Sequence, residues 1–329
     1  MSALAPTLQA FFTDRLLQQR GASPNTVVAY KTALGLLVRF AGERAGKRPC
    51  DLDIVDLDAT VVVSFLEHLE KDRRNGTRTR NNRLAAIHSL YAYAALRHPE
   101  HAALIQRVLA IPAKRYQRNL VTYLSDEEVD AVLAACDVTT WTGRRDRAMF
   151  VLAIQTGLRI SELAALRCSD VTLGPGANVH TVGKGRRERR TPLVAHTVEV
   201  LRPWLAERHA DEDAPLFPTT TGRRLSSDAI ERRLWLYVRK AGAHCPSIAT
   251  KRVTVHTLRH TCAMRLHAQG VDVAVIALWL GHAQVSTANV YLHADMAQKE
   301  RAIARVAPSA VKPGRYRPPD PLLAFLEAL

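Results

Sequence analysis

Six polar side chains in the second half of the chain are of types that can act together on a phosphodiester: Arg159, Lys184, His256, Arg259, His282 and Tyr291. A tyrosine hydroxyl has a pKa of about 10, so forming its phenolate at neutral pH costs roughly 4 kcal/mol unless a base or a positive field lowers that pKa. Clustered cations supply such a field. Guanidiniums and a histidine would also stabilise charge on the non-bridging oxygens, and a flexible lysine would protonate the leaving sugar oxygen. This chemistry requires no metal and no other cofactor.

Glycines position the first two of these residues. In TGLRISEL, Gly157 ends a helix expected over residues 144–155, and Arg159 lies at the bend before Ser161 restarts a helix. Lys184 lies between two glycines in VTLGPGANVHTVGKGRRERRTPLV, where they let the backbone approach a ligand closely. The β-branched residues and glycine-containing turns of this segment predict a small antiparallel sheet with Lys184 at a hairpin tip.

The two residues His256 and Arg259 are three positions apart, so they share one face of a helix expected over residues 256–269. His260 forms an i, i+4 pair with His256, a spacing that zinc sites use. The intervening Arg259 would repel a cation, so we expect no metal site there.

The last two residues follow another helix end. Gly281 closes a helix expected over residues 272–280, His282 comes next, and Tyr291 is expected on the following short helix. Two further helices are expected after His196 and after Ser227.

The first hundred or so residues are expected to be helical throughout. Ser23 and Pro24 provide an N-cap and a proline at the first helical position, and apolar residues then recur at helical spacing until Gly42, which is expected to end that helix. Two more one-sided helices are expected, one ending before the Asn75-Gly76 turn and one before Pro99.

Basic residues gather where the third of these helices is expected to open, interleaved with threonine and asparagine: Arg73, Arg74, Arg78, Arg80 and Arg83. Cations and short polar side chains at a helix N-terminus suit phosphates and base edges. The alternative is a solvated, arginine-rich face.

A linker is expected between residues 111 and 125, where IPAKRYQRNLVTYLS loses periodicity and contributes Lys114 and Arg115 without nearby acids. Ser125 and Glu128 then form a capping box, which marks a new helix and a new domain.

The composition favours a polyanionic partner. The 329 residues include 46 Lys and Arg against 31 Asp and Glu, which gives a formal charge of +15 and a pI near 10.1. The five cysteines are scattered without a C-x-x-C pair, so neither a zinc ribbon nor a disulfide framework is expected. No stretch approaches the ~18 apolar residues that span a bilayer, and no secretory leader is evident, so we expect a cytoplasmic protein with no membrane partner.

Four segments, in this order, resemble the successive signature boxes of the phage integrase, or tyrosine recombinase, family: TGLRISELAAL, VGKGRRERRTPL, HTLRHTCAMRLHAQG and LWLGHAQVSTANVYLHAD. The resemblance covers residues 120–307, and S-P-N-T-V-x-x-Y near the N-terminus resembles the family's core-binding domain. It implies a site-specific DNA recombinase that cuts and rejoins strands through a covalent 3′-phosphotyrosyl intermediate. Integration, excision or transposition of a mobile DNA element would use this chemistry.

The resemblance also implies a role for each of the six residues. Arg159 and Arg259 would clamp the scissile phosphate, and Lys184 would act as general acid toward the 5′-hydroxyl. His256 would accept the tyrosine proton, His282 would donate a further hydrogen bond to the phosphate, and Tyr291 would become joined to the 3′-phosphate. Glu162 matches the acidic residue after the first arginine box and is expected to orient or pack. We expect double-stranded DNA to be contacted by Arg78, Arg80, Arg83, Lys114, Arg115, Arg186 and Arg187.

The expected fold is mainly α with a small antiparallel β-sheet in the catalytic domain. A helical core-binding domain at residues 1–111, a linker at 112–124 and a mixed α/β catalytic domain at 125–307 would form a clamp around DNA. Residues 308–329 would form a tail, whose last nine residues carry one apolar stripe of Leu322, Phe325, Leu326 and Leu329.

So short a helix must dock, either on its own domain or on a neighbouring subunit. The resemblance implies a tetrameric synapse with swapped C-terminal segments and therefore favours the neighbour. Accessory proteins or sister recombinases are further expected partners.

Two other functions fit parts of the pattern. A type IB topoisomerase would use the same catalytic set to relax DNA, but a helical domain ahead of the catalytic one and a swapping helix favour paired synapsis. A catalytically idle DNA-binding regulator would be expected to have lost at least one of the six residues, and all six are present.

Overall fold

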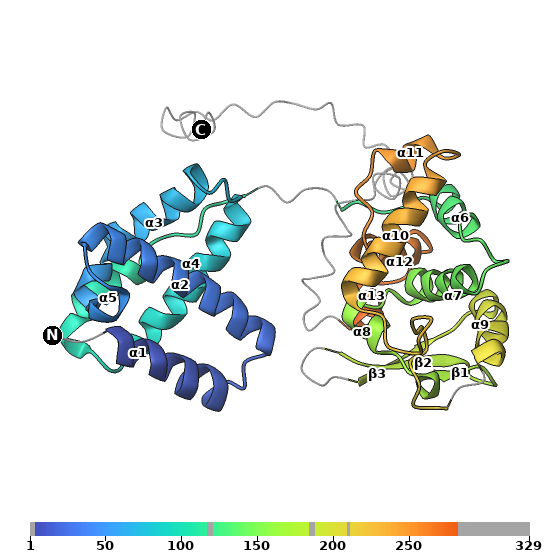
Figure 1. Ribbon diagram of the computed structural model, residues 1–329, viewed down its shortest axis with the longest axis horizontal. Helices are drawn as coiled ribbons and strands as arrows, with labels where there is room; N and C mark the ends of the chain where they lie inside the picture. The colour runs from blue at the N-terminus through green and yellow to red at the C-terminus, as the bar shows by residue number, and fades with distance from the viewer. Residues whose placement is uncertain (1–3, 117–120, 184–187, 209–210, 282–329) are drawn as a thin grey trace, which may run out of the picture. The chain divides into compact units, whose positions relative to one another are not determined.

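The computed structural model describes residues 4–116, 121–183, 188–208 and 211–281. The chain forms two compact units, residues 1–118 and 119–329, and each has its own hydrophobic core. Figure 1 labels the elements of both. Within the described ranges, no helix combines the length and the apolar character needed to cross a membrane.

The described part of unit 1 is built from helices, as predicted. Its buried core joins side chains from all five α-helices. The elements are α1 Leu4–Ala10, the π-helical turn η1 Phe11–Gln19, α2 Pro24–Ala45, the 3₁₀ turns η2 Pro49–Asp51 and η3 Ile54–Leu57, α3 Ala59–Lys71, α4 Thr77–Ala94, the 3₁₀ turn η4 Pro99–His101 and α5 Ala102–Leu109.

Helix α2 begins as predicted but ends later. The Ser23 side chain accepts a hydrogen bond from the backbone N–H of Thr26, and Pro24 is the first helical residue. The prediction that Gly42 ends this helix is wrong, because the left-handed cap is Gly46, with φ of 63°. Gly42 lies in the helix interior, where an added Cβ would come within 2.9 Å of the Lys47 carbonyl oxygen.

Helix α4 also begins later than predicted. Gly76 is its N-cap and Thr77 its first residue, so Arg73 and Arg74 lie before the helix. Arg74 lies in the connection between α3 and α4 and adopts a left-handed backbone conformation with φ of 51°.

The described part of unit 2 combines helices with a small antiparallel sheet, again as predicted. Within that part the sheet has three strands in the order β1-β2-β3, and Thr181 pairs with Arg189 across the last two. The elements are α6 Asp126–Ala134, α7 Trp141–Thr156, α8 Ile160–Ala165, the 3₁₀ turn η5 Cys168–Asp170, β1 Val171–Thr172, β2 Asn178–Val182, β3 Glu188–Pro192, α9 Ala195–Arg208, α10 Ser227–Ala241, α11 Pro246–Ala249, α12 Val255–Ala268 and α13 Val273–Leu280.

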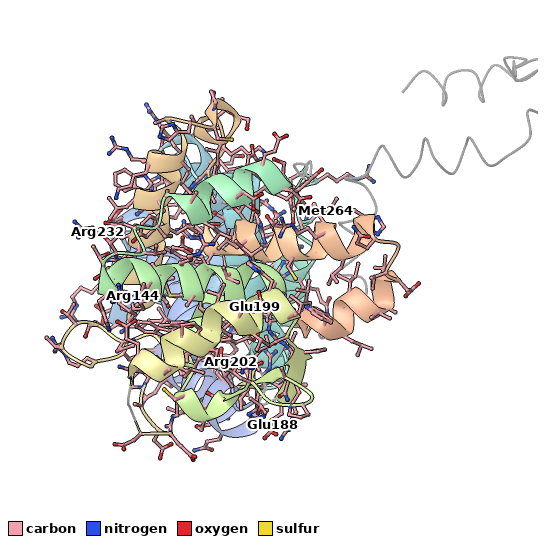
Figure 2. The ribbon with its side chains drawn as sticks, turned by 90° about the vertical axis from the view of Figure 1, so that its right-hand side faces the viewer. Arg144, Glu188, Glu199, Arg202, Arg232 and Met264 are labelled. Atoms are coloured by element: carbon pink, nitrogen blue, oxygen red, sulfur yellow. The ribbon has the colours of Figure 1, made fainter. Side chains whose placement is uncertain are left out.

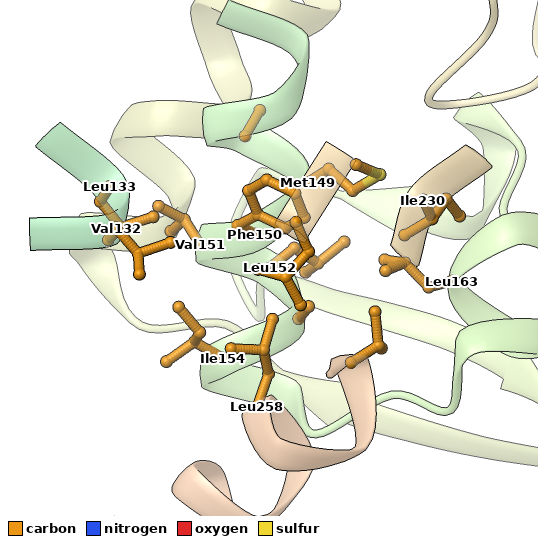
Figure 3. Packing of buried hydrophobic residues seen from close by; sticks show 14 of the residues in the cluster. Val132, Leu133, Met149, Phe150, Val151, Leu152, Ile154, Leu163, Ile230 and Leu258 are labelled. Carbon is orange, nitrogen blue, oxygen red and sulfur yellow. The ribbon is translucent and has the colours of Figure 1, made fainter. Parts of the chain in front are cut away.

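Helix α7 is the centre of unit 2. It packs against both α9 and α12, and Figure 2 shows it running beside α9, with Arg144 near one end. The buried run from Ala148 to Ile154 surrounds the helix with apolar contacts, and Figure 3 shows α6, α8, α10 and α12 contributing to this cluster. A helix that is buried on nearly all sides forms a rigid base for its C-terminal end.

A buried polar cluster ties α10 to α7. The Asp146 carboxylate is fully buried and accepts hydrogen bonds from Arg145 on its own helix, and from Arg233 and the Tyr237 hydroxyl on α10. Since each oxygen has partners, the buried charge is compensated. The helix that precedes α11 and α12 is thereby held in place.

Two glycines in α2 should respond in opposite directions to alanine. Gly35 has open space where a Cβ would lie, so Gly35→Ala should stabilise α2 by about 0.5–1 kcal/mol through the lower conformational entropy of the unfolded chain. Gly42→Ala should destabilise the same helix, because the Lys47 carbonyl must move. Native-state hydrogen exchange of α2 amides in the full chain measures both; equal effects would contradict this packing.

Candidate active site

The C-terminal ends of α7 and α13 meet through two left-handed glycines. Gly157 caps α7 with φ of 63°, and Gly281 caps α13 with φ of 64°. A Cβ added to Gly157 would lie only 2.5 Å from Cδ2 of Leu280, so the approach of the two helix ends leaves no room for a side chain. The last carbonyls of both helices therefore point into one small region.

Arg259 of α12 binds both helix ends. Its side chain donates from Nη1 to the Gly157 carbonyl at 2.6 Å and from Nη2 to the Leu280 carbonyl at 2.7 Å. The residue is only 2% exposed. Carbonyls at helix C-termini carry the negative end of the helix dipole, so these two carbonyls help to compensate the buried guanidinium.

Arg159 reaches the same place from α8. Its Nη2 donates to the Gly281 carbonyl at 2.9 Å, one residue beyond the carbonyl that binds Arg259. Its Nη1 donates to Oε1 of Glu162 at 2.7 Å, and its backbone N–H donates to Oε2 at 2.9 Å. The side chain remains 32% exposed, so this guanidinium is open to a ligand.

Glu162, which is expected to orient or pack, is buried and binds two arginines. The carboxylate side chain is only 3% exposed, and it binds Arg159 and also Arg189 of β3, whose Nη1 and Nη2 donate at 3.2 and 2.9 Å. Burial raises the pKa of Glu162, but hydrogen bonds from Arg189 and the Arg159 backbone, the charge of Arg189 and the side-chain hydrogen bond from Arg159 outweigh it and hold the pKa below its ordinary value.

Arg189 belongs to this cluster of contacts, and the sequence analysis did not single it out. The signal lay in the strand alternation, because Arg189 is two positions from the buried Thr191 and therefore points to the same, inward side of β3. The adjacent Arg190 is exposed, whereas Arg189 is in step with the buried face of the strand.

His256 lies near the beginning of α12, one turn before Arg259. Its ring is exposed, and it packs edge-to-face against the His260 ring with centroids 4.3 Å apart. The start of this helix is fixed by Thr254, which caps Thr257, and by Glu231, whose carboxylate accepts from the backbone N–H of Val255. An exposed imidazole thus stands on a rigid helix that also carries the buried guanidinium.

Several predicted site residues lie outside the described residues: Lys184, Arg186, Arg187, His282 and Tyr291, together with the tail at 308–329. Described residues lie next to two of them in the sequence, Lys184 and His282. Val182 pairs with Glu188, so Lys184 belongs to the connection between β2 and β3. His282 directly follows Gly281, which accepts the hydrogen bond from Arg159.

In unit 1 the predicted DNA contacts differ in exposure. Arg80 is only 6% exposed, and its Nη1 donates to the Pro112 carbonyl and to Asn81, so its side chain holds the segment after α5. Arg78 and Arg115 are exposed. Arg83 is half-buried, and burial followed by the charge of Arg73 lowers its pKa. Lys114 is exposed and pairs with Glu70 at 2.6 Å.

An apolar cavity of about 430 Å³ lies elsewhere in unit 2. Its lining comes from α6, α7, α12 and α13, with further residues at the start of α9, and includes Val129, Leu133, Val151, Ile154, Leu266 and Trp279. On α13 the neighbouring Leu278 is 77% exposed. A surface of this kind suits an apolar segment better than a phosphate.

Comparison with known proteins accounts for both units. Residues 122–298 match the phage integrase family, and residues 10–98 match the phage integrase N-terminal SAM-like domain. The chain is 49% identical over 328 residues to a putative integrase/recombinase, y4rC, of Sinorhizobium fredii, covering 100% of this chain and 99% of that one. It is 32% identical to the tyrosine recombinase XerC of Myxococcus xanthus, covering 94% and 100%.

Solved structures show the same fold. The XerH site-specific recombinase, in a post-cleavage complex with its palindromic difH substrate, superposes with a TM-score of 0.71. The match covers 87% of this chain and 81% of that one, with 23% sequence identity.

The environment of Glu162 predicts a dependence of stability on pH. Because its pKa in the folded state is lowered, ionised Glu162 stabilises the fold above the unfolded-state pKa of about 4.3, and this contribution is lost as the pH falls through the lower, folded-state pKa. Glu162→Gln should therefore reduce the loss of stability on acidification. Urea unfolding of unit 2 between neutral and acidic pH measures this, with the exposed Glu199→Gln on α9 as control (Figure 2). Identical acid-side curves for wild type and Glu162→Gln would contradict it.

Proposed function

Since the chain belongs to the phage integrase family and is a tyrosine recombinase, an enzyme that cuts and rejoins DNA at specific sites, we propose that its catalytic residues are Arg159, Lys184, His256, Arg259, His282 and Tyr291. The observation that carries the proposal is the binding of Arg159 and Arg259 to consecutive carbonyls at one helix end. The family and its named relatives are integrases and recombinases, which favours strand exchange over the topoisomerase and regulator alternatives.

The proposed reaction is a pair of transesterifications. The Tyr291 oxygen attacks phosphorus, a 3′-phosphotyrosyl bond forms, and the bond to the 5′-oxygen breaks. His256 accepts the phenolic proton, and Lys184 gives a proton to the departing 5′-oxygen. The 5′-hydroxyl of a second strand then attacks the phosphotyrosyl bond and releases Tyr291. One phosphodiester replaces another, as integration, excision or transposition of a DNA element requires.

The two arginines have unequal parts in this proposal. Arg259 is buried and directed by two carbonyls, so it offers a fixed positive charge beneath the phosphate. Arg159 is more exposed. Its Nη1 and Nη2 each donate one orienting hydrogen bond, to Glu162 and to the Gly281 carbonyl, which leaves its other N–H donors for a non-bridging oxygen. Preorganised donors of this kind stabilise charge that develops in the transition state.

Double-stranded DNA is the substrate of this enzyme class, and we assign its binding to two domains. Residues 1–111 form the core-binding domain, residues 112–124 the linker and residues 125–307 the catalytic domain. Arg78, Arg83, Lys114 and Arg115 are the proposed contacts in the first part of the chain, with Arg186 and Arg187 beside Lys184. Arg80 supports them by holding the segment at Pro112.

Replacing the proposed nucleophile should separate binding from cleavage. Tyr291→Phe should bind a nicked site-containing duplex as well as wild type but form no covalent protein–DNA adduct, because it lacks the attacking oxygen. Denaturing gels of trapped adduct, together with fluorescence anisotropy for affinity, measure both properties. An adduct that persists in this variant would place the nucleophile elsewhere.

We further propose that the enzyme self-associates on DNA through its tail. The stripe of Leu322, Phe325, Leu326 and Leu329 matches the chemistry of the apolar cavity in unit 2. Proline residues at 313, 318 and 319 lie in the sequence between this stripe and the catalytic domain, and proline is unfavourable inside a helix. We assign the cavity of a neighbouring subunit as its docking site, in a tetrameric complex.

Removing either side of this contact should weaken assembly. Deletion of residues 320–329 should reduce cooperativity of DNA binding, and Leu266→Glu in the cavity should do the same by placing a charge against the stripe. Leu236→Glu, at an exposed position of α10, serves as the matched control. Gel-shift titrations and light scattering of DNA complexes report the result; undiminished cooperativity in the deletion would rule the contact out.

A further inference from the structure

The buried carboxylate of Glu162 is shared by two guanidiniums of different exposure. Arg159 is 32% exposed and Arg189 only 12% exposed, while the Glu162 side chain itself is 3% exposed. Two positive charges on one negative charge leave a formal excess of one positive charge in the trio. The excess is best placed on the more exposed member, Arg159, which also lies where a ligand has access.

Arg189 also contacts the second partner of Arg159. A Cβ added to Gly281 would lie 2.8 Å from Nη1 of Arg189 and 3.3 Å from its Cδ, so the arginine side chain packs directly on this glycine. The Gly281 carbonyl is the acceptor for Nη2 of Arg159. Arg189 therefore supports Arg159 at both of its side-chain anchors, Glu162 and Gly281.

The position of Arg189 in the chain adds a third connection. It is the second residue of β3, paired with Thr181 of β2, and so lies immediately after the connection that contains Lys184. An ion pair from β3 to the buried Glu162 attaches the base of that connection to α8.

We propose that Arg189 is a positioning residue for the reaction: it neutralises Glu162, so that the charge of Arg159 is available to the scissile phosphate, and it anchors the strand that follows Lys184. The inference rests on the proposed role of Arg159 as a phosphate ligand. If Arg189 were lost, Glu162 would remain as a buried carboxylate, and Arg159 would become its principal ion-pair partner.

Charge compensation makes a prediction that simple packing does not. Arg189→Ala should slow adduct formation by on the order of 10–100-fold at saturating DNA. Adding Glu162→Gln should restore part of the rate, because the neutral amide no longer competes with phosphate for Arg159. Arg189→Lys should retain more activity than Arg189→Ala, because lysine keeps the positive charge. It should remain slower than wild type, because lysine cannot form the bidentate pair with Glu162.

The experiment is single-turnover adduct formation by the full chain on a nicked duplex, with melting temperature and DNA affinity measured in parallel. Arg190→Ala is the matched control, because it removes the same charge from the adjacent, exposed position of β3. It should cleave at close to the wild-type rate. A 5′-bridging phosphorothiolate substrate, whose leaving group needs no proton, tests whether Arg189 also acts by anchoring the strand that follows Lys184. This substrate should restore the cleavage rate of Lys184→Ala fully and that of Arg189→Ala only partly.

Two results would overturn the proposal. One is an Arg189→Ala rate equal to that of Arg190→Ala. The other is a slow Arg189→Ala enzyme that Glu162→Gln fails to accelerate although the double variant is folded and binds DNA. Tyr291→Phe in the same assay separates a failure of the proposed function from a failure of the proposed role of Arg189. An adduct in Tyr291→Phe would refute the proposed nucleophile, whereas the rates of the Arg189 variants test only the positioning role of Arg189.

Discussion

The hydrogen bonds between guanidiniums and the carbonyls of two helix ends organise the catalytic unit. Helices α7 and α13 each end in a left-handed glycine, and their last carbonyls would be unsatisfied without external donors. Arg259 joins both ends, and Arg159 binds the carbonyl next to one of them. The same contacts satisfy the backbone and aim positive charge. The packing that buries α7 therefore also determines where these two guanidiniums lie.

Compensation of buried charge links this arrangement to the sheet. Glu162 would be costly to bury with a single partner, and the second partner comes from β3 rather than from a helix. The ion pair thus joins β3 to α8, in addition to its pairing with β2 and the hydrogen bond from Gln155 to the Pro192 carbonyl. The cluster around Asp146 applies the same physical rule elsewhere, between α7 and α10, where its effect is to hold the scaffold.

Unit 1 illustrates that an arginine in a strongly basic segment can be buried and can hold neighbouring backbone in place. Arg80 belongs to the arginine-rich start of α4, yet its side chain is buried and donates to the Pro112 carbonyl. Asn81 adds two hydrogen bonds with Lys114, so the segment after α5 is held along α4. Exposed neighbours such as Arg78 then extend from a helix whose surroundings are fixed.

The sequence by itself determined the family, the class of fold, the helix starts marked by Ser23 and by the capping box of Ser125, and the six residues suited to phosphodiester chemistry, because these depend on local spacing and residue type. It placed Arg159 at a bend and Gly157 and Gly281 at helix ends, as the structure has them. It misjudged Gly42, because whether a glycine ends a helix depends on what packs against it. Only the tertiary structure decided the role of Arg189 and the burial of Arg80. Both arginines find their partners far along the chain, at Glu162 and Pro112, and no local pattern specifies such a pairing.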